Sequence, residues 1–209
     1  FFKQKTAYEI YQCDWSSDVC SSDLEFNEIW WFYCSQDSTT PDRYVVYNYM
    51  ERIWYYGQMN RTAWIDCPAR EYPIAAIDGN LIYQELGLAD DTTGTAQPLA
   101  AYIQSADFDL DDGYQFAFIK RLIPDITFSG STDSTPAVVM TLYARDFPGG
   151  PYNQETDEPV ARTATVPVEQ YSEQKWVRLR GRQIAFRVSS DSTGTQWSLG
   201  IPRIDVQPD

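Results

Sequence analysis

The sequence predicts an all-β fold, with partial propeller-like meander blades followed by an antiparallel β-sandwich, and three observations support this prediction. The 209 residues include ten Phe, seven Trp and fifteen Tyr, and aromatic side chains favour the pleated, half-buried surface of a sheet. Apolar runs of strand length alternate along the chain with turns rich in Asp, Gly, Ser and Pro. No stretch of the sequence has a convincing helical pattern.

Three apolar runs near the start predict a meander with short connections. They cover residues 28–35, 43–49 and 53–59. Both alternating faces of the first run are apolar, as in a strand buried on both sides. A hairpin is expected over residues 72–85, because it contains Asp78-Gly79, a dipeptide that tight turns favour. Repeated short meanders with aromatic strands are typical of propeller blades, and a simple meander sheet is the alternative.

Longer strands follow the loop at residues 87–98 and predict the sandwich. Six long strands fit two sheets that bury facing apolar rows, and Pro124 splits the second of them. The expected strands cover residues 99–110, 114–128, 137–147, 161–171, 175–188 and 195–206. The domain organisation expected from this pattern is a propeller-like part of a larger domain at residues 25–98 and a β-sandwich domain at residues 99–209.

Four arginines in an otherwise acidic chain form the candidate interaction site: Arg178, Arg180, Arg182 and Arg187. One interpretation is a solvated strand face that neutralises nearby acids. The other is an intersubunit patch that contacts an acidic surface of a neighbour, since Arg is enriched at interfaces and its guanidinium pairs well with carboxylates. Because the apolar parity changes between Leu179 and Ile184, we expect a β-bulge at Gly181 that resets the inward face.

Composition excludes several classes of function. The net charge of −14 disfavours a surface that coats nucleic acid, because binding to phosphates depends on Lys and Arg. The chain has no histidine, which removes the usual general base, the Ser-His and Cys-His pairs and the commonest zinc ligand. No apolar run is long enough to span a bilayer. We therefore expect no enzyme activity, no cofactor, no bound metal and no membrane contact.

Two further motifs each have a structural and a functional interpretation. The stretch "DFDLDDG" at residues 107–113 resembles a calcium loop. In such a loop glycine directly follows the third acid and a Glu closes the loop, but here Asp112 precedes the glycine and Phe118 takes the place of the Glu. These differences favour a strand that enters a turn. The clusters "WWFY" and "WYY" are either sugar-stacking platforms or core and interface residues. The second interpretation is favoured because apolar residues occupy both alternating faces of the expected strands. Cys34 and Cys67 are expected to be small buried side chains.

The first 24 residues contain neither an apolar run nor an amphipathic pattern. Physical interpretations are a polar tail, or a metal loop or disulfide hairpin that uses Cys13 and Cys20, although this spacing matches no standard zinc pattern. The stretches "FKQKTAYEI" and "DWSSDVCSSDL" resemble two parts of one sequencing-library adapter, translated in the same frame. We therefore expect residues 1–24 to be an artefact fused to a metagenomic fragment, which leaves residues 25–209 with a net charge of −12.

The stretches "EIWWFY", "DRYVVYNYMERIWYYGQMNRTAW", "YPIAAIDGNLIYQELG" and "WVRLRGRQIAFRVSS" resemble the C-terminal region of tailed-bacteriophage virion proteins. The resemblance extends through "TQWSLGIPRIDVQPD" and is to β-propeller tail components of short-tailed phages, the nozzle or packaged-DNA stabilisation proteins. It implies a structural protein of the virion tail, assembled in the host cytoplasm as a ring of identical subunits, often a hexamer. Its implied partners are the portal, the adaptor, other tail proteins and the genomic DNA that passes through the ring.

The acidic composition is compatible with such a role, because like charge prevents a channel wall from sticking to the phosphates of sliding DNA. No sequence-specific DNA binding is expected. The rival hypothesis is a carbohydrate-binding β module that recognises host glycans, since sandwiches and propellers carry such functions too. A soluble hydrolase is the weakest hypothesis, because the chain has no histidine, no nucleophile elbow and no phosphate loop.

Overall fold

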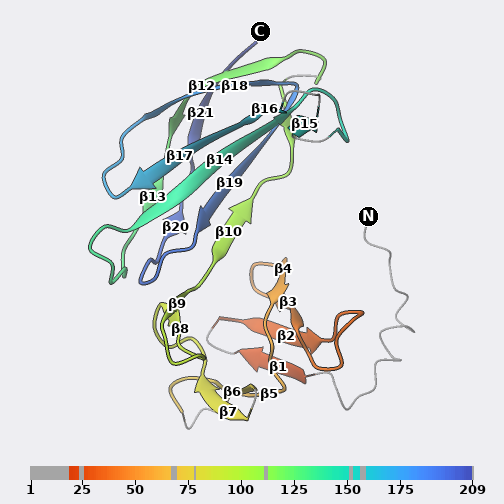
Figure 1. The fold of residues 1–209 in the computed structure, drawn as a ribbon, viewed down its shortest axis with the longest axis vertical. Coiled ribbons are helices and arrows are strands. Elements are labelled where there is room, and N and C mark those ends of the chain that lie inside the picture. The colour runs from red at the N-terminus through yellow and green to blue at the C-terminus, as the bar shows by residue number, and fades with distance from the viewer. Residues whose placement is uncertain are drawn as a thin grey trace. The chain divides into compact units, whose positions relative to one another are not determined.

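The computed structural model describes residues 19–23, 26–66, 70–77, 79–110, 113–150, 153–155 and 159–208 (Figure 1). Every helix or strand assigned among these residues is a β-strand, so the all-β class predicted from the sequence is confirmed. Contacts divide the chain into two compact units, Phe1–Leu86 and Gly87–Asp209. The division falls before the predicted boundary at residue 98, and a hydrogen bond from the Gly194 amide to the Leu88 carbonyl (3.3 Å) joins the intervening loop to the second unit.

The first unit begins with an antiparallel meander of four strands in chain order. These are β1 (Val19–Asp23), β2 (Glu28–Tyr33), β3 (Arg43–Asn48) and β4 (Ile53–Gln58). The predicted three-stranded meander is therefore present, with one more strand at its edge. The β3–β4 turn is fixed by Asn48, whose side-chain oxygen accepts hydrogen bonds from the amides of Met50 (3.1 Å) and Glu51 (2.8 Å).

Most of the segment that resembles an adapter, residues 1–18 and residue 24, lies outside the described residues. Its remaining part, Val19–Asp23, forms β1 by antiparallel pairing with β2. Ladder hydrogen bonds of this kind join backbone groups, which every residue except proline supplies in the same form. The pairing of β1 with β2 therefore uses backbone groups that any segment without proline can supply.

A second meander completes the first unit. Its strands are β5 (Ala63–Ile65), β6 (Ile74–Ile77) and β7 (Asn80–Tyr83). The predicted hairpin is confirmed, because Ile77 pairs with Asn80 across a two-residue turn. Asp78 lies outside the described residues, and Gly79 has the positive φ of +80° that such a turn requires. The described residues thus contain two meanders, and no closed propeller is present among them.

The second unit is a β-sandwich. Its larger sheet has the order β10-β19-β14-β17, with β11 also paired to β19, and its smaller sheet has the order β18-β12-β21. The larger sheet comprises β10 (Ala101–Gln104), β11 (Phe108–Asp109), β14 (Ala137–Arg145), β17 (Thr163–Glu169) and β19 (Gln183–Ser190). The smaller comprises β12 (Ala117–Ile123), β18 (Lys175–Gly181) and β21 (Arg203–Pro208).

Three short two-stranded pairs lie in the connections, and β15 with most of β16 lies between the expected strands at residues 137–147 and 161–171. They are β8 (Ala89–Asp90) with β9 (Gln97–Pro98), β13 (Ile126–Thr127) with β20 (Ser198–Leu199), and β15 (Asn153–Glu155) with β16 (Pro159–Ala161). The predicted break at Pro124 is confirmed, because it separates β12 from β13.

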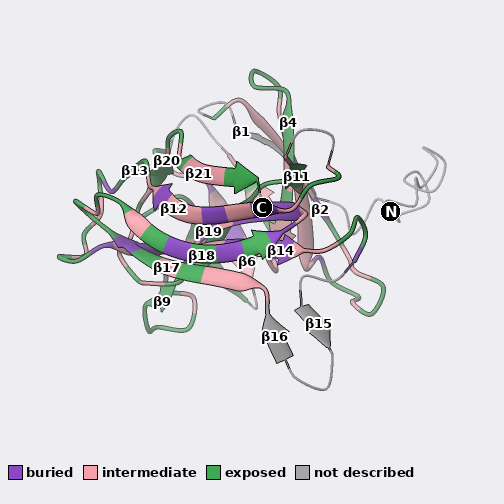
Figure 2. Ribbon diagram, turned by 90° about the horizontal axis from the view of Figure 1, so that it is seen from above, coloured by how far each residue is buried: buried purple, intermediate pink, exposed green. Residues whose placement is uncertain are grey.

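Alternating side chains build the core between the two sheets. Along β14 the buried residues are Val138, Met140, Leu142 and Ala144, with more exposed residues between them. The smaller sheet contributes Ile119 and Leu122 from β12 and Val177 and Leu179 from β18. Figure 2 shows the alternation of buried and exposed residues along β18. Because both inner faces are covered, each sheet presents one outer face, and the two outer faces point in opposite directions.

The run 175–188, predicted as one strand with a bulge, is two strands in different sheets. β18 ends at Gly181, and β19 begins at Gln183 in the opposite sheet. The change of apolar parity is therefore real, but its cause is a corner at which the chain changes sheet and not a bulge. Gly181 suits this corner because a Cβ there would lie 2.6 Å from the Cβ of Ala144.

Candidate functional site

Arg178 and Arg180 lie on the outer face of the smaller sheet. In β18 they alternate with buried Val177 and Leu179, and both arginines are exposed. Trp176 precedes them on the same face and is 66% exposed. This placement agrees with the expectation of a solvent-facing arginine strand.

Of the other two predicted site residues, Arg182 stays near Arg180 and Arg187 does not. Arg182 is the corner residue between the two sheets, and its guanidinium lies 5.1 Å from the ring centre of Phe116, the same ring that the Arg180 guanidinium contacts. Arg187 projects from the outer face of the larger sheet, where its guanidinium lies 4.0 Å from the ring centre of Tyr102. Since the outer faces point in opposite directions, the structure does not bring all four arginines together.

Three further cations join Arg178 and Arg180 on the smaller sheet. Lys120 and Arg121 are consecutive residues of β12 at a register shift, and Arg203 begins β21. The irregular register brings the Lys120 ammonium (3.8 Å) and the Arg121 guanidinium (3.3 Å) to the same carboxylate oxygen of Asp205. We call this surface the basic face; it comprises Lys120, Arg121, Trp176, Arg178, Arg180, Arg203 and Asp205.

Aromatic rings support the arginines of the basic face. The Arg180 guanidinium lies 4.0 Å from the ring centre of Phe116, and that of Arg121 lies 6.0 Å from Trp176. Such contacts attract a cation to the negative face of a ring and hold it in a preferred position. Sequence reasoning missed Lys120, Arg121 and Arg203 because they belong to other strands, and only the adjacent Lys-Arg pair gave a local signal.

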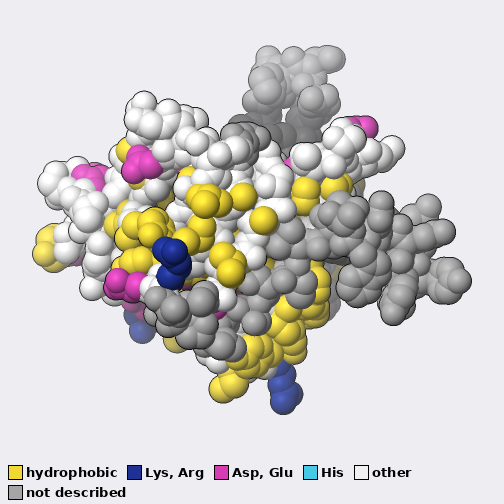
Figure 3. Space-filling view, turned by 90° about the horizontal axis from the view of Figure 1, so that it is seen from below, with side chains coloured by type: hydrophobic (Ala, Val, Ile, Leu, Met, Phe, Trp, Pro, Cys, Tyr) yellow, Lys and Arg dark blue, Asp and Glu magenta, His cyan; other side chains and the backbone are white. Residues whose placement is uncertain are grey.

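A second surface, the aromatic face, lies on the first unit. Directly paired residues of an antiparallel sheet share a face, so β2, β3 and β4 together place five rings on one side. The rings belong to Trp31, Tyr33, Tyr47, Trp54 and Tyr56. Trp54 stacks between Tyr47 (4.5 Å between ring centres) and Trp31 (5.8 Å) and is still 61% exposed. Figure 3 shows several separate patches of hydrophobic side chains on one face of the molecule.

The opposite side of this sheet has a structural role. Phe32 is fully buried, and Trp30 stacks on Trp64 of β5 with ring centres 5.6 Å apart. Gly57 lets the ring of Tyr44 cross β4, since a Cβ there would lie 2.3 Å from the Tyr44 hydroxyl. Alternate residues of the "WWFY" cluster therefore lie on a packed side and on an exposed side of the sheet. The prediction that residues 28–35 are buried on both sides is wrong for Tyr33, which is exposed.

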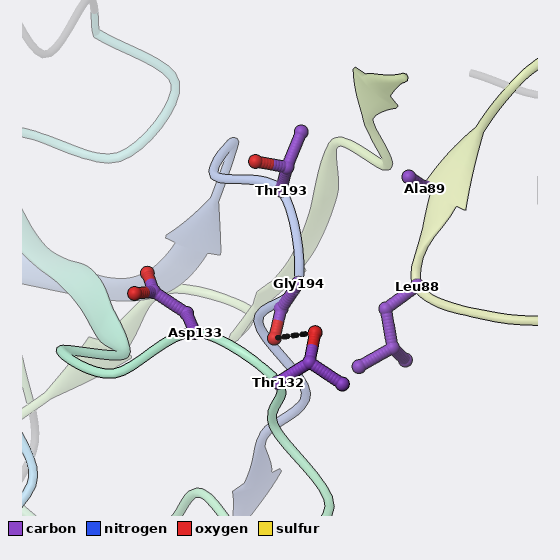
Figure 4. Close-up of a pocket in the computed structure, with 6 residues that line it drawn as sticks. All are labelled: Leu88, Ala89, Thr132, Asp133, Thr193 and Gly194. Carbon is purple, nitrogen blue, oxygen red and sulfur yellow. Dashed lines mark hydrogen bonds between the residues drawn. The ribbon is translucent and has the colours of Figure 1, made fainter.

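A surface hollow of about 440 Å³ in the second unit lies among its loops (Figure 4). It is lined by Leu88, Ala89, Thr132, Asp133, Thr193 and Gly194. The Gly194 carbonyl accepts hydrogen bonds from the amides of Thr132 (2.9 Å) and Asp133 (3.1 Å), which fasten two loops together. One carboxylate and no cation line the hollow, so it does not supply the acid and base pair that hydrolysis requires.

The acids of the "DFDLDDG" stretch are used for structure where they are described. Asp107 is paired with Arg145, and Asp109 accepts a hydrogen bond from the Gln183 side chain (3.2 Å). Asp111 and Asp112 lie outside the described residues, and no group of His, Cys, Asp or Glu among the described residues could hold a metal ion. The described acids thus fit the strand interpretation of this motif.

The remaining sequence motifs give no site. Cys34, which was expected to be buried, is half-buried, and Cys67 lies outside the described residues. The part of the chain that the structure describes has no helix with the length and apolarity needed to cross a membrane. Comparisons with protein-family models and with curated proteins found no match to this chain.

Proposed function

We propose that the protein is a structural subunit of a tailed-bacteriophage tail. In this proposal identical copies assemble into a ring of the nozzle or packaged-DNA stabilisation type, next to the portal and adaptor, and help to retain and conduct DNA. The observation that carries the proposal is that the chain presents two exposed surfaces made of interface residue types. The aromatic face offers Trp and Tyr rings, and the basic face offers Arg with Trp176.

The charge distribution supports the same role. The net charge of −12 over residues 25–209 favours overall repulsion of phosphates, which suits a wall past which DNA slides.

Electron microscopy of the purified full chain tests this proposal. Negatively stained particles are expected to give class averages of closed rings with a central opening. Particles of single-subunit size at micromolar concentration, or open filaments, would contradict it. A measured turnover of an esterase or glycosidase substrate would contradict the non-enzymatic part of the proposal.

The aromatic face supports one second candidate function, the binding of neutral glycans. Exposed rings on a flat sheet can stack on sugar rings, and Arg43 and Gln58 lie on the same side of the sheet as hydrogen-bond donors. A glycan array separates the candidates. Specific binding that is lost on Trp54→Ala and kept on Tyr171→Ala, a control for an exposed ring in the second unit, would favour glycan recognition.

A further inference from the structure

The basic face of the second unit is unusual for this chain because its cations outnumber its acids. Five cations and one carboxylate lie on the outer side of three paired strands. Asp205 is shared by Lys120 and Arg121, while Arg178 and Arg203 form no ion pair with any described residue. The face therefore keeps a net positive charge, although the second unit as a whole carries 10 basic and 17 acidic residues.

The loops at one end of the same sandwich have the opposite composition. Residues 87–99, 124–136 and 190–202 contain no Lys or Arg. Hydrogen bonds join them: Gly194 bonds to Leu88 and to Thr132, and the Ile201 amide donates to the Asp125 carboxylate (2.8 Å). We call this surface the acidic end; its carboxylates are Asp90, Asp91, Asp125, Asp133 and Asp191.

Two carboxylates of the acidic end accept backbone hydrogen bonds. Asp125 accepts from the amide of Ile201, and Asp133 accepts from the amide of Thr135 (3.0 Å). No described Lys or Arg forms an ion pair with Asp125, Asp133 or Asp191. One unit thus presents two surfaces of opposite charge.

We infer that the basic face of one copy binds the acidic end of the next copy in a head-to-tail interface. This inference rests on the proposed ring function and names the surfaces that would build the ring. A contact between two different surfaces of identical subunits propagates from copy to copy and closes when the rotation per step fits. Complementary charge fixes the orientation of the partner, and Trp176 among arginines is a residue combination typical of the centre of an interface.

A second copy fits the basic face better than a nucleic acid does. An extended polyanion that crossed this face would continue onto a net negative surface and be repelled there. Each copy of the chain carries one acidic end and one basic face. The stoichiometry of opposite surfaces is therefore balanced in an assembly of identical subunits.

Charge reversal in the full chain tests the interface. One variant carries Arg178→Glu and Arg203→Glu on the basic face, and the other carries Asp133→Lys and Asp191→Lys on the acidic end. Arg52→Glu with Arg70→Glu in the first unit makes the same change of charge as the first variant and serves as its control. Sedimentation velocity over a range of concentrations measures self-association, and circular dichroism confirms that each variant is folded.

Each reversed variant is expected to weaken self-association at least about tenfold, while the control associates like the wild type. An equimolar mixture of the two variants should recover association, because the reversed face and the reversed end are again complementary. Raising the salt concentration should weaken association of the wild type, because these charges are exposed to solvent.

The outcomes separate this inference from the proposed function. A wild type that stays monomeric overturns the ring and the interface together. A wild type that associates, with both reversed variants associating equally well, overturns the interface alone. Binding of a single-stranded oligonucleotide that is lost in the Arg178→Glu and Arg203→Glu variant, with unchanged self-association, would assign the basic face to nucleic acid instead.

Discussion

Asp42 shows how one half-buried carboxylate organises a connection in the first unit. It accepts hydrogen bonds from the hydroxyl and the amide of Ser35, both at 2.7 Å, and so closes the loop between β2 and β3. The Ser35 hydroxyl, and then its amide, hold the pKa of Asp42 below its ordinary value of 3.8. The stabilisation that this provides is fully present above about pH 3.8 and is lost as the pH falls through the lowered pKa.

Ser35→Ala is therefore expected to raise the pKa of Asp42 towards 3.8, because the variant lacks the hydroxyl donor. NMR titration of the Asp42 carboxyl carbon measures this directly. Ser38→Ala, which alters the same loop without touching Asp42, should leave the titration unchanged. An unshifted pKa in Ser35→Ala would show that the hydroxyl does not stabilise the charged carboxylate.

Gly181 determines how the chain passes from one sheet of the sandwich to the other. An added Cβ would lie 2.6 Å from the Cβ of Ala144 and 3.2 Å from the carbonyl oxygen of Arg145. We expect Gly181→Ala to lower the free energy of unfolding by about 1–3 kcal/mol through overpacking. Urea denaturation measures the loss. The double variant with Ala144→Gly should lose less unfolding free energy than the sum of the losses in the two single variants. Simple additivity would contradict the steric explanation.

At the scale of elements, β14 is the strand on which the sandwich depends most. It pairs with β17 on one side and β19 on the other, and its inward residues are almost completely buried. Leu142→Ala is expected to cost about 2–5 kcal/mol of unfolding free energy, because it leaves a cavity between the sheets. Val139→Ala, on the outer side of the same strand, should cost much less. Similar losses for both variants in chemical denaturation would contradict the assigned inner face.

Sequence patterns predicted the strands better than they predicted their partners. The break at Pro124 and the hairpin around Gly79 were predictable, because proline geometry and positive φ are local properties. The assignment of β18 and β19 to different sheets was not, since two strands joined by one residue have the same local pattern as one bulged strand. This is why Arg178 and Arg187 were expected together and lie on opposite outer faces.

The composition of the basic face was only half predictable for a related reason. Alternation within β18 placed Arg178 and Arg180 correctly, but Lys120 and Arg203 come from strands whose pairing no local pattern specifies. In the first unit, β2 has aromatic residues on both faces, so its sequence does not show which face is packed. The contacts of Trp30 and Phe32 with Trp64 of another meander decide it.

At the scale of the whole molecule, the chain combines an acidic overall charge with a confined basic surface. An evenly acidic protein would repel its own copies, whereas one basic face and one acidic end allow copies to associate in a single orientation. The aromatic face of the first unit adds apolar area that can be buried in the same assembly. The proposed ring thus follows from surfaces and not from a catalytic site.

Native mass spectrometry of the full chain at low micromolar concentration tests the central claim most directly. The account predicts one dominant species whose mass is a fixed whole-number multiple of the subunit mass, as a closed ring requires. This species should give way to monomers when charge is reversed on the basic face. A spectrum containing only monomers, or an open series of steadily increasing oligomers, would contradict the claim that the protein is a ring subunit.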